Sequence, residues 1–238
     1  MCRHLAYLGP PVPLAELCFD APHSLRDQAR HPRLQIYGDD NPDGWAVAWW
    51  DHDALRDYRT TTPIWQDHEF DGRPVSGAWM AAARFAAPGS KLDARAAAPL
   101  VGDRWMCSLN GIVDGFYDGV GERLRARCSS ARRATLVTDS DTEVCFAWFR
   151  DRLEDGTQPA DAIRGLVKEL ETETTGRFNF LVADGRVVVA SVVGNSLFVR
   201  RDPLVIASEP LDDGPEWAPL PDRSLVVAQA GSVEVDRL

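Results

Sequence analysis

The sequence lacks a long apolar segment and has no secretion signal. Its most apolar stretch, residues 187–193, is far shorter than the roughly 20 residues that a membrane-spanning helix needs. The N-terminal segment has no apolar core followed by a small-residue cleavage site, which a secretory signal requires. We therefore expect a cytoplasmic protein with no membrane partner.

Cysteine is scarce, with five residues in 238, and no Cys-x-x-Cys pair occurs. The odd number and the wide spacing argue against both a disulfide framework and a zinc site. The five histidines show no spacing typical of metal ligands, so no metal site is expected. Four cysteines are interpreted as reduced packing residues, namely Cys18, Cys107, Cys128 and Cys145.

Basic residues are outnumbered, with 26 Lys and Arg against 36 Asp and Glu and a net charge of −10. An acidic surface repels phosphate backbones, so a nucleic-acid partner is not expected. The composition is 45% hydrophobic and 26% charged, which is typical of globular proteins. No repeat, low-complexity tract or linker divides the chain, and we predict one domain over residues 1–238.

Apolar runs and alternation predict about ten strands. Strands are expected at residues 3–8, 45–50, 77–85, 105–109, 178–183, 187–193, 197–201, 204–207, 224–228 and 232–235. Asp184-Gly185 and Gly194-Asn195 predict hairpin turns in a meander. Helices are expected at residues 14–19, 24–30, 120–128, 142–153 and 160–171. Strands, then helices, then strands indicate an α+β fold with antiparallel sheets.

Cys2 directly follows the initiator Met1, which aminopeptidases remove when the next side chain is small. Removal leaves a thiol and a free α-amine on one residue. Their ordinary pKa values are about 8.5 and about 7.7–8.0, so the amine can accept the thiol proton near neutral pH. Cys2 could thus supply both nucleophile and general base without a separate histidine.

Further segments accompany residues 1–9 in a fixed order. They are 41–45, 83–89, 108–113, 138–144, 207–213 and 221–225. Together they resemble class II glutamine amidotransferase-type N-terminal-nucleophile (Ntn) hydrolases. The set is most similar to the ergothioneine-pathway amidohydrolases, which remove glutamate from γ-glutamyl hercynylcysteine sulfoxide. The resemblance spans almost the whole chain, and the ordered set is specific although each motif alone is weak.

The resemblance implies a role for each motif. Arg84 would bind the α-carboxylate of a γ-glutamyl group, because a planar guanidinium presents the paired donors that a carboxylate needs. Asp141 would hold the α-ammonium, so that the γ-carbonyl is fixed over the Cys2 sulfur. The Asn110 side-chain amide and the Gly111 backbone N–H would form the oxyanion hole.

The resemblance also implies a four-layer αββα sandwich with two antiparallel sheets. Cys2 would start a central strand, with Arg84 and Asn110 at nearby strand ends. No metal or organic cofactor is implied. The expected partner is a small γ-glutamyl substrate, and a homodimer is left open.

Each motif alone also has a plainer interpretation. An arginine at a strand end is often a solvated or salt-bridged surface group, and Asn-Gly is often a hairpin turn. An aspartate before a helix is often an N-cap, which Asp141 could be. Asp139 competes with Asp141 for the ammonium role; Asp141 is preferred because Asp-Thr-Glu-Val matches the family motif better.

Three places depart from the family pattern. Leu109 stands where the family has histidine before Asn-Gly, and Ala46 replaces a glycine. Ile36-Tyr37-Gly38 replaces an Arg-His-Gly-like triplet. These changes leave γ-glutamyl hydrolysis credible and raise a question about the amine half of the substrate.

Three functions remain for the chain. The first is hydrolysis of γ-glutamyl hercynylcysteine sulfoxide or of another γ-glutamylated intermediate. The second is a glutaminase subunit that passes ammonia to a separate partner synthase. The third is a non-catalytic amino-acid binder, which a retained Met1 would favour because it blocks the α-amine.

Overall fold

The computed structural model describes residues 2–238, whose strands form two sheets. The first sheet contains β1 (Arg3–Pro13), β2 (Trp45–Asp51), β3 (Ala54–Thr60), β4 (Val75–Ala83), β9 (Phe198–Arg201), β10 (Leu204–Ala207) and β11 (Ala218–Pro219). The second contains β5 (Leu100–Gly102), β6 (Trp105–Val113), β7 (Gly176–Ala183), β8 (Val188–Val192), β12 (Ser224–Gln229) and β13 (Ser232–Arg237). The helices are η1 (Glu16–Asp20), α1 (Leu25–Arg30), η2 (Ala94–Ala96), η3 (Phe116–Asp118), α2 (Val120–Arg127), α3 (Ser130–Arg133), α4 (Asp141–Glu154) and α5 (Pro159–Glu173).

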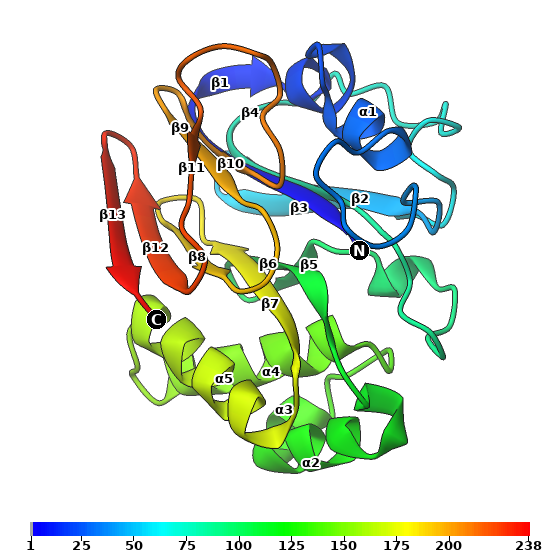
Figure 1. The fold of residues 1–238 in the computed structure, drawn as a ribbon, viewed down its shortest axis with the longest axis vertical. Helices are drawn as coiled ribbons and strands as arrows, with labels where there is room; N and C mark the ends of the chain where they lie inside the picture. The colour runs from blue at the N-terminus through cyan, green and yellow to red at the C-terminus, as the bar shows by residue number, and fades with distance from the viewer. Residues whose placement is uncertain (1) are drawn as a thin grey trace.

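The two sheets lie face to face, with helices on the outer face of each (Figure 1). Helix α1 contacts β1 and β4 of the first sheet, whereas α4 and α5 contact β6 and β8 of the second. The strand pairs within both sheets are antiparallel. The predicted α+β fold, a four-layer αββα sandwich, is confirmed.

Strand alternation decides which side chains enter the space between the sheets. β1 is the central strand of the first sheet. Its Ala6 belongs to the core between the sheets, together with Met106 of β6, while Leu5 belongs to the outer core. Successive side chains on a strand point to opposite faces. Cys2 and His4 therefore share the inner face with Ala6.

Strand register brings distant residues to the start of β1. Arg3 is opposite Ala83 in the β1–β4 pair, so Arg84 follows the end of β4 beside Cys2, as predicted. Asn110 lies inside β6 opposite Asn179 of β7, not at a strand end. The pairing continues through the next residue, so this Asn-Gly pair is strand and not a hairpin turn.

The predicted meander is wrong at one turn. The Asp-Gly turn at 184–185 joins β7 to β8 as an antiparallel pair, as predicted. The Gly-Asn pair at 194–195 instead carries the chain from β8 in the second sheet to β9 in the first. Buried Asn179 holds this crossing, because its Nδ2 donates to the Asn195 carbonyl at 2.9 Å and its Oδ1 accepts from the Val193 N–H at 2.8 Å. A side chain distant in sequence thus overrides the hairpin signal.

The start of α4 also differs from the prediction. Ser140 is the N-cap, and its Oγ accepts a hydrogen bond from the Glu143 N–H at 3.2 Å. Asp141 is instead the first residue of the helix. Because Ser140 satisfies the capping requirement, the Asp141 carboxylate is available for other contacts.

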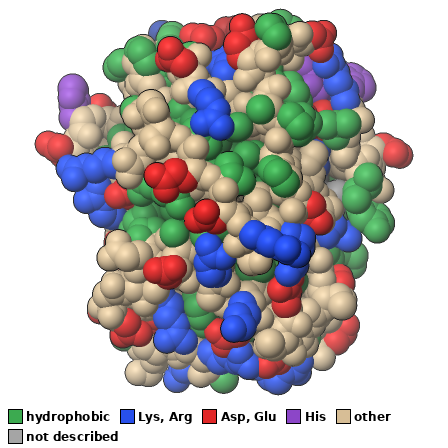
Figure 2. Space-filling model, turned by 60° about the vertical axis from the view of Figure 1, so that its left-hand side comes forward, with side chains coloured by type: hydrophobic (Ala, Val, Ile, Leu, Met, Phe, Trp, Pro, Cys, Tyr) green, Lys and Arg blue, Asp and Glu red, His purple; other side chains and the backbone are tan. Residues whose placement is uncertain are grey.

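The surface carries both signs of charge. On the face shown in Figure 2, Lys and Arg side chains are interspersed with Asp and Glu. Many charged side chains of the molecule form exposed ion pairs, such as Arg33 with Asp213 at 2.9 Å. Within residues 2–238, none of the helices has both the length and the apolar character needed to cross a bilayer.

Replacing Asn179 with alanine tests the crossing between the sheets. Asn179→Ala should lower the free energy of unfolding by about 2–4 kcal/mol, because the Val193 N–H and the Asn195 carbonyl lose a buried partner. Urea denaturation measures this difference. The control is Asp222→Ala, which removes an exposed carboxylate that accepts from the Gly194 N–H in the same crossing. Water can replace this acceptor, so the free energy of unfolding should fall by less than about 1 kcal/mol. Equal effects of the two substitutions would contradict the role of Asn179.

Candidate active site

A small pocket at the N-terminal end of β1 contains four of the five predicted site residues. They are Cys2, Arg84, Gly111 and Asp141, which come from four separate segments of the chain. The cavity volume is about 30 Å³. Fold topology therefore assembles a thiol, a guanidinium, a carboxylate and a strand backbone around one space.

Cys2 differs from the other cysteines in its exposure. All five lie within residues 2–238 and are free; Cys2 is partly exposed and the other four are buried. Burial raises the pKa of all four buried thiols, which makes them poor nucleophiles. The Cys2 Sγ lies 3.8 Å from the carbonyl oxygen of Phe85, next to Arg84. Met1 is outside the described residues.

Arg84 is buried, with only 7% of its surface exposed, so the interpretation as a solvated surface group is wrong. Its Nη2 donates to Ser90 Oγ and to the Lys91 carbonyl, each at 3.2 Å. Its Nη1 is buried and has no hydrogen-bond partner within residues 2–238. A buried guanidinium nitrogen without a partner is costly, and a carboxylate ligand would satisfy it.

The Asp141 carboxylate lies across the same pocket. Its Oδ1 accepts from the Thr142 N–H at 2.7 Å and its Oδ2 from the Val113 N–H at 3.3 Å. Burial raises the pKa of Asp141, although these hydrogen bonds and the charge of Arg84 oppose the shift. Asp139, the competing candidate, does not line the pocket and lies 3.9 Å from Lys91 Nζ. Asp141 is therefore better placed to receive an ammonium group.

Gly111 presents its backbone to the pocket. Backbone N–H groups alternate along a strand, so those of residues 111 and 113 point to the same edge. The Val113 N–H donates to Asp141, so the Gly111 N–H lies on the same edge of β6 as Asp141. β5 pairs with β6 only as far as Cys107, so it does not cover this part of the edge. A Cβ at this position would lie 1.8 Å from the Arg177 carbonyl oxygen, so no side chain can replace the glycine without backbone movement.

Asn110 is the predicted residue that does not line the pocket. Its side chain is fully buried, and Nδ2 donates to Ser208 Oγ at 3.3 Å. Its Oδ1 has no partner among residues 2–238, and its backbone carbonyl accepts from Asn195 Nδ2 at 2.7 Å. The structure therefore puts Asn110 beside Gly111 with its amide directed at Ser208.

Sequence reasoning missed two residues near the pocket. His4 lies on the same strand face as Cys2, is fully buried, and has its Nδ1 3.1 Å from Ser108 Oγ. Burial, followed by the charge of Arg3, lowers the pKa of His4 to about 3, so its ring is neutral at physiological pH. Strand alternation could have identified His4. Tyr117 also lines the pocket, and no sequence pattern marks it.

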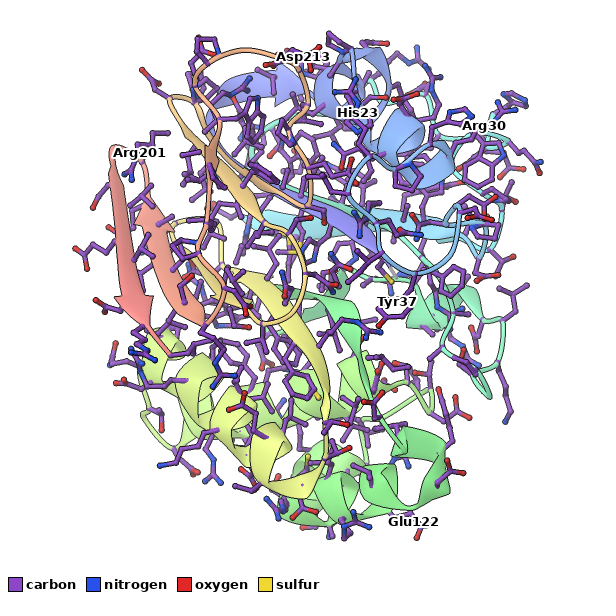
Figure 3. The ribbon with its side chains drawn as sticks, in the orientation of Figure 1. His23, Arg30, Tyr37, Glu122, Arg201 and Asp213 are labelled. Atoms are coloured by element: carbon purple, nitrogen blue, oxygen red, sulfur yellow. The ribbon has the colours of Figure 1, made fainter. Side chains whose placement is uncertain are left out.

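The Glu209 carboxylate is a third missed group, on the outer side of the first sheet. It is fully buried and accepts from Arg3 Nη1 and His23 Nε2, each at 2.8 Å. It also accepts from the backbone N–H groups of Arg33 and Leu34 at 2.9 and 3.0 Å. Figure 3 shows His23 near α1, above the first sheet.

Arg3 connects this carboxylate to Cys2. The Arg3 Nε donates to the carbonyl oxygen of Cys2 at 3.0 Å, while its Nη1 binds Glu209. Burial alone raises the pKa of Glu209, but hydrogen bonds from His23 and from two backbone N–H groups, with the charge of Arg3, outweigh it and lower the pKa. The carboxylate is thus ionised and fixes the position of the residue that follows Cys2.

A much larger cavity lies elsewhere. It measures about 680 Å³ and is lined by Trp50, His52, Arg104 and Asp184 among others, but by none of the predicted site residues. Across residues 2–238, no group of three or more His, Cys, Asp or Glu side chains has an arrangement that could hold a metal ion. Four of the five predicted site residues instead line the small pocket at Cys2.

Solved structures share this fold. A glutamine aminotransferase class-II domain protein from Silicibacter pomeroyi has a TM-score of 0.70 at 20% identity, covering 99% of each chain. Glutamine phosphoribosylpyrophosphate amidotransferase from B. subtilis has a TM-score of 0.71 at 15% identity, covering all of this chain and 49% of that one. The fold, with a cysteine at the start of its central strand, is that of the class II glutamine amidotransferase-type Ntn hydrolases.

Sequence comparison then identifies the family. The γ-glutamyl-hercynylcysteine sulfoxide hydrolase of Mycobacterium tuberculosis is 35% identical over 237 residues, covering 97% of this chain and 94% of the relative. The enzyme of that name from Mycolicibacterium smegmatis is 34% identical over 245 residues and covers both chains completely. No family model matches the chain. This protein belongs to the family of γ-glutamyl-hercynylcysteine sulfoxide hydrolases, and it is an amidohydrolase.

Acid unfolding tests the role of Glu209. Its folded-state pKa is lowered, so the carboxylate stabilises the fold above its unfolded pKa, and this stability is lost as pH falls through the folded pKa. Glu209→Gln should cost about 3–5 kcal/mol at pH 7, because Arg3 and His23 lose a buried partner. From about pH 4.5 downward, the variant should lose less stability than the wild type.

The control for this prediction is Glu171→Gln. Glu171 forms a surface ion pair with Arg223, and its removal should change the free energy of unfolding by less than about 1 kcal/mol. Chemical denaturation at several pH values measures both variants. Parallel pH profiles for Glu209→Gln and the wild type would contradict the assignment.

Proposed function

We propose that this protein hydrolyses the γ-glutamyl amide bond of γ-glutamyl hercynylcysteine sulfoxide in ergothioneine biosynthesis, with Cys2 as the nucleophile. The observation that carries the proposal is the common pocket of the Cys2 thiol, the Arg84 Nη1, which has no partner within residues 2–238, and the half-buried Asp141 carboxylate. The names of the two mycobacterial relatives support the choice of substrate.

The γ-glutamyl half of the substrate is a zwitterion. Arg84 binds its α-carboxylate through Nη1, the nitrogen that has no partner among residues 2–238. Asp141 binds its α-ammonium, and this new charge partner offsets the burial that raises the pKa of the carboxyl. Two opposite charges at fixed positions orient the γ-carbonyl toward the Cys2 sulfur. Recognition and positioning therefore use the same contacts.

The chemistry requires removal of Met1, which frees the Cys2 α-amine. The amine accepts the thiol proton, and the sulfur forms a bond to the γ-carbonyl carbon while the carbonyl π electrons move to oxygen. The Gly111 N–H stabilises this oxyanion, and the Asn110 Nδ2 becomes its second donor by turning from Ser208 Oγ toward the pocket when substrate binds. The intermediate then collapses, the C–N bond breaks, and the leaving nitrogen takes the proton from the α-ammonium.

Water completes the cycle. It attacks the resulting thioester carbon and gives a proton to the α-amine, after which the C–S bond breaks. The sulfur recovers that proton, and glutamate leaves with the free thiol restored. The expectations of a cytoplasmic location, of no nucleic-acid partner and of one catalytic unit over residues 1–238 stay predictions.

Glutamate release distinguishes the candidate functions. The purified protein is incubated separately with γ-glutamyl hercynylcysteine sulfoxide, glutamine and glutathione, and its N-terminal mass is measured. Release from the sulfoxide, with Met1 absent, is the expected result. Release from glutamine alone would instead favour an ammonia-supplying subunit, and release from none, with Met1 retained, would favour an amino-acid binder.

Cys2→Ala should lower the rate of glutamate release by at least about 10³-fold, because the nucleophile is lost. Calorimetry should still detect substrate binding, since Arg84 and Asp141 remain. The control Cys18→Ala removes a buried thiol on the outer side of the first sheet and should keep activity within about twofold. Substantial turnover by Cys2→Ala would refute the mechanism.

Arg84→Gln should raise KM by about 10–100-fold, because a charge-assisted pair with the substrate carboxylate is lost. The matched measurement uses an analogue whose γ-glutamyl half lacks the α-carboxylate. Wild-type protein should discriminate strongly between the two compounds, and the variant only weakly. Arg186→Gln, an exposed arginine that does not line the pocket, is the control. Unchanged discrimination in Arg84→Gln would remove Arg84 from this role.

A further inference from the structure

Arg177 and Tyr37 form a contact between the second sheet and a loop of the first layer, near Cys2. The Arg177 guanidinium carbon lies 4.2 Å from the centroid of the Tyr37 ring. Arg177 belongs to β7, whereas Tyr37 belongs to the loop between α1 and β2. This loop is held by the Glu209 carboxylate through the Arg33 and Leu34 N–H groups. Figure 3 shows Tyr37 near the start of β1.

Arg177 extends from the inner face of the second sheet. It shares strand parity with Leu181, which packs in the core between the sheets. It lies opposite Ile112, and its carbonyl oxygen packs against Gly111. Gly194 makes room for its stem, since a Cβ there would lie 2.8 Å from the Arg177 Cγ. The guanidinium is thus positioned beside the strand that carries the Gly111 N–H.

Tyr37 approaches the nucleophile from the opposite layer. Its neighbour Gly38 packs on the Phe85 ring, because a Cβ at Gly38 would lie 2.9 Å from that ring. The Phe85 carbonyl oxygen is in turn the group 3.8 Å from Cys2 Sγ. The Tyr37 side chain is 54% exposed, so one side of the stacked pair is open to solvent.

The pocket at Cys2 is too small to enclose a whole γ-glutamyl amide. Its volume is about 30 Å³, and neither Tyr37 nor Arg177 lines it. With the γ-glutamyl group between Arg84 and Asp141, the amine half extends outside the pocket. The Arg177 backbone carbonyl packs on Gly111, and Gly38, next to Tyr37, packs on Phe85; because Gly111 and Phe85 both line the pocket, the stacked side chains lie at its border, where they can meet that half.

We propose that Arg177, held against the Tyr37 ring, binds the carboxylate of the amino acid that hydrolysis releases. This inference rests on the proposed function. A guanidinium stacked on an aromatic ring keeps its N–H groups in the ring-parallel plane, where they can donate in pairs to a carboxylate. Glutamine releases ammonia and offers no such carboxylate. Arg177 thus selects γ-glutamyl amino acids over glutamine.

The test compares two substrates that differ by one carboxylate. They are γ-glutamyl-S-methylcysteine sulfoxide and its counterpart lacking the cysteine carboxylate, γ-glutamyl-2-(methylsulfinyl)ethylamide. The wild type should prefer the first by about 10–100-fold in kcat/KM. Arg177→Gln should lose most of this preference while kcat/KM for the second compound changes little. Tyr37→Ala should lose part of it, because the guanidinium loses its support.

The matched control is Arg152→Gln. Arg152 also stacks on an aromatic ring, with its guanidinium carbon 4.7 Å from the Trp148 centroid, but it lies near the end of α4 away from Asp141. Its substitution should leave the preference unchanged. The inference would be overturned if Arg177→Gln lowered kcat/KM equally for both compounds. It would also be overturned if the variant kept the wild-type preference for the compound with the carboxylate.

Binding measurements separate this inference from the proposed function. Both compounds are titrated calorimetrically into Cys2→Ala protein, with and without Arg177→Gln. If no compound is hydrolysed by the wild type but binding still depends on Arg177 and on the carboxylate, the hydrolase proposal fails and the subsite stands. If hydrolysis proceeds while binding discriminates equally with and without Arg177, the subsite fails and the hydrolase proposal stands. Absence of both hydrolysis and binding would overturn both.

Discussion

The buried carboxylate of Glu209 is the constraint on which the catalytic end of the molecule depends. An ionised carboxylate inside a protein is unfavourable unless donors surround it, and here two side chains and two backbone N–H groups do so. One donor, Arg3, also binds the Cys2 carbonyl. The two backbone donors belong to the loop that presents Tyr37. A single charge therefore fixes the nucleophile strand and the loop beside it together.

The pocket combines rigidity with incomplete pairing. Arg84 is anchored through Nη2 while Nη1 has no partner within residues 2–238, and the half-buried Asp141 carboxylate accepts from the neutral N–H groups of Val113 and Thr142. Such groups are held in position before a ligand arrives, so little reorganisation is needed on binding. Complementary ligand charges would relieve the cost of burying both groups. This arrangement explains why the fold tolerates a buried guanidinium and carboxylate without pairing them to each other.

Local patterns were reliable where one face of a strand is buried. Alternating or continuous apolar runs located β1, β4, β7 and β10, because burial forces that pattern on the sequence. β3 escaped prediction because it is an edge strand with a largely polar, exposed sequence. The Gly-Asn signal after β8 failed because hydrogen bonds from Asn179, distant in sequence, direct that segment toward the other sheet. The N-cap was placed one residue late because Ser140 and Asp141 are both good caps.

The sequence by itself determined the fold class, the family resemblance, and Cys2, Arg84, Gly111 and Asp141 as the candidate residues, since these depend on residue types in a fixed order. Only the tertiary structure decided which groups lack partners, how Asn110 is engaged with Ser208, and that Glu209 and Arg177 lie near the site. The physical reason is that hydrogen bonding, burial and stacking depend on contacts between residues far apart in the chain. Arg3 and Glu209 are separated by 206 positions, and no local pattern records that they meet.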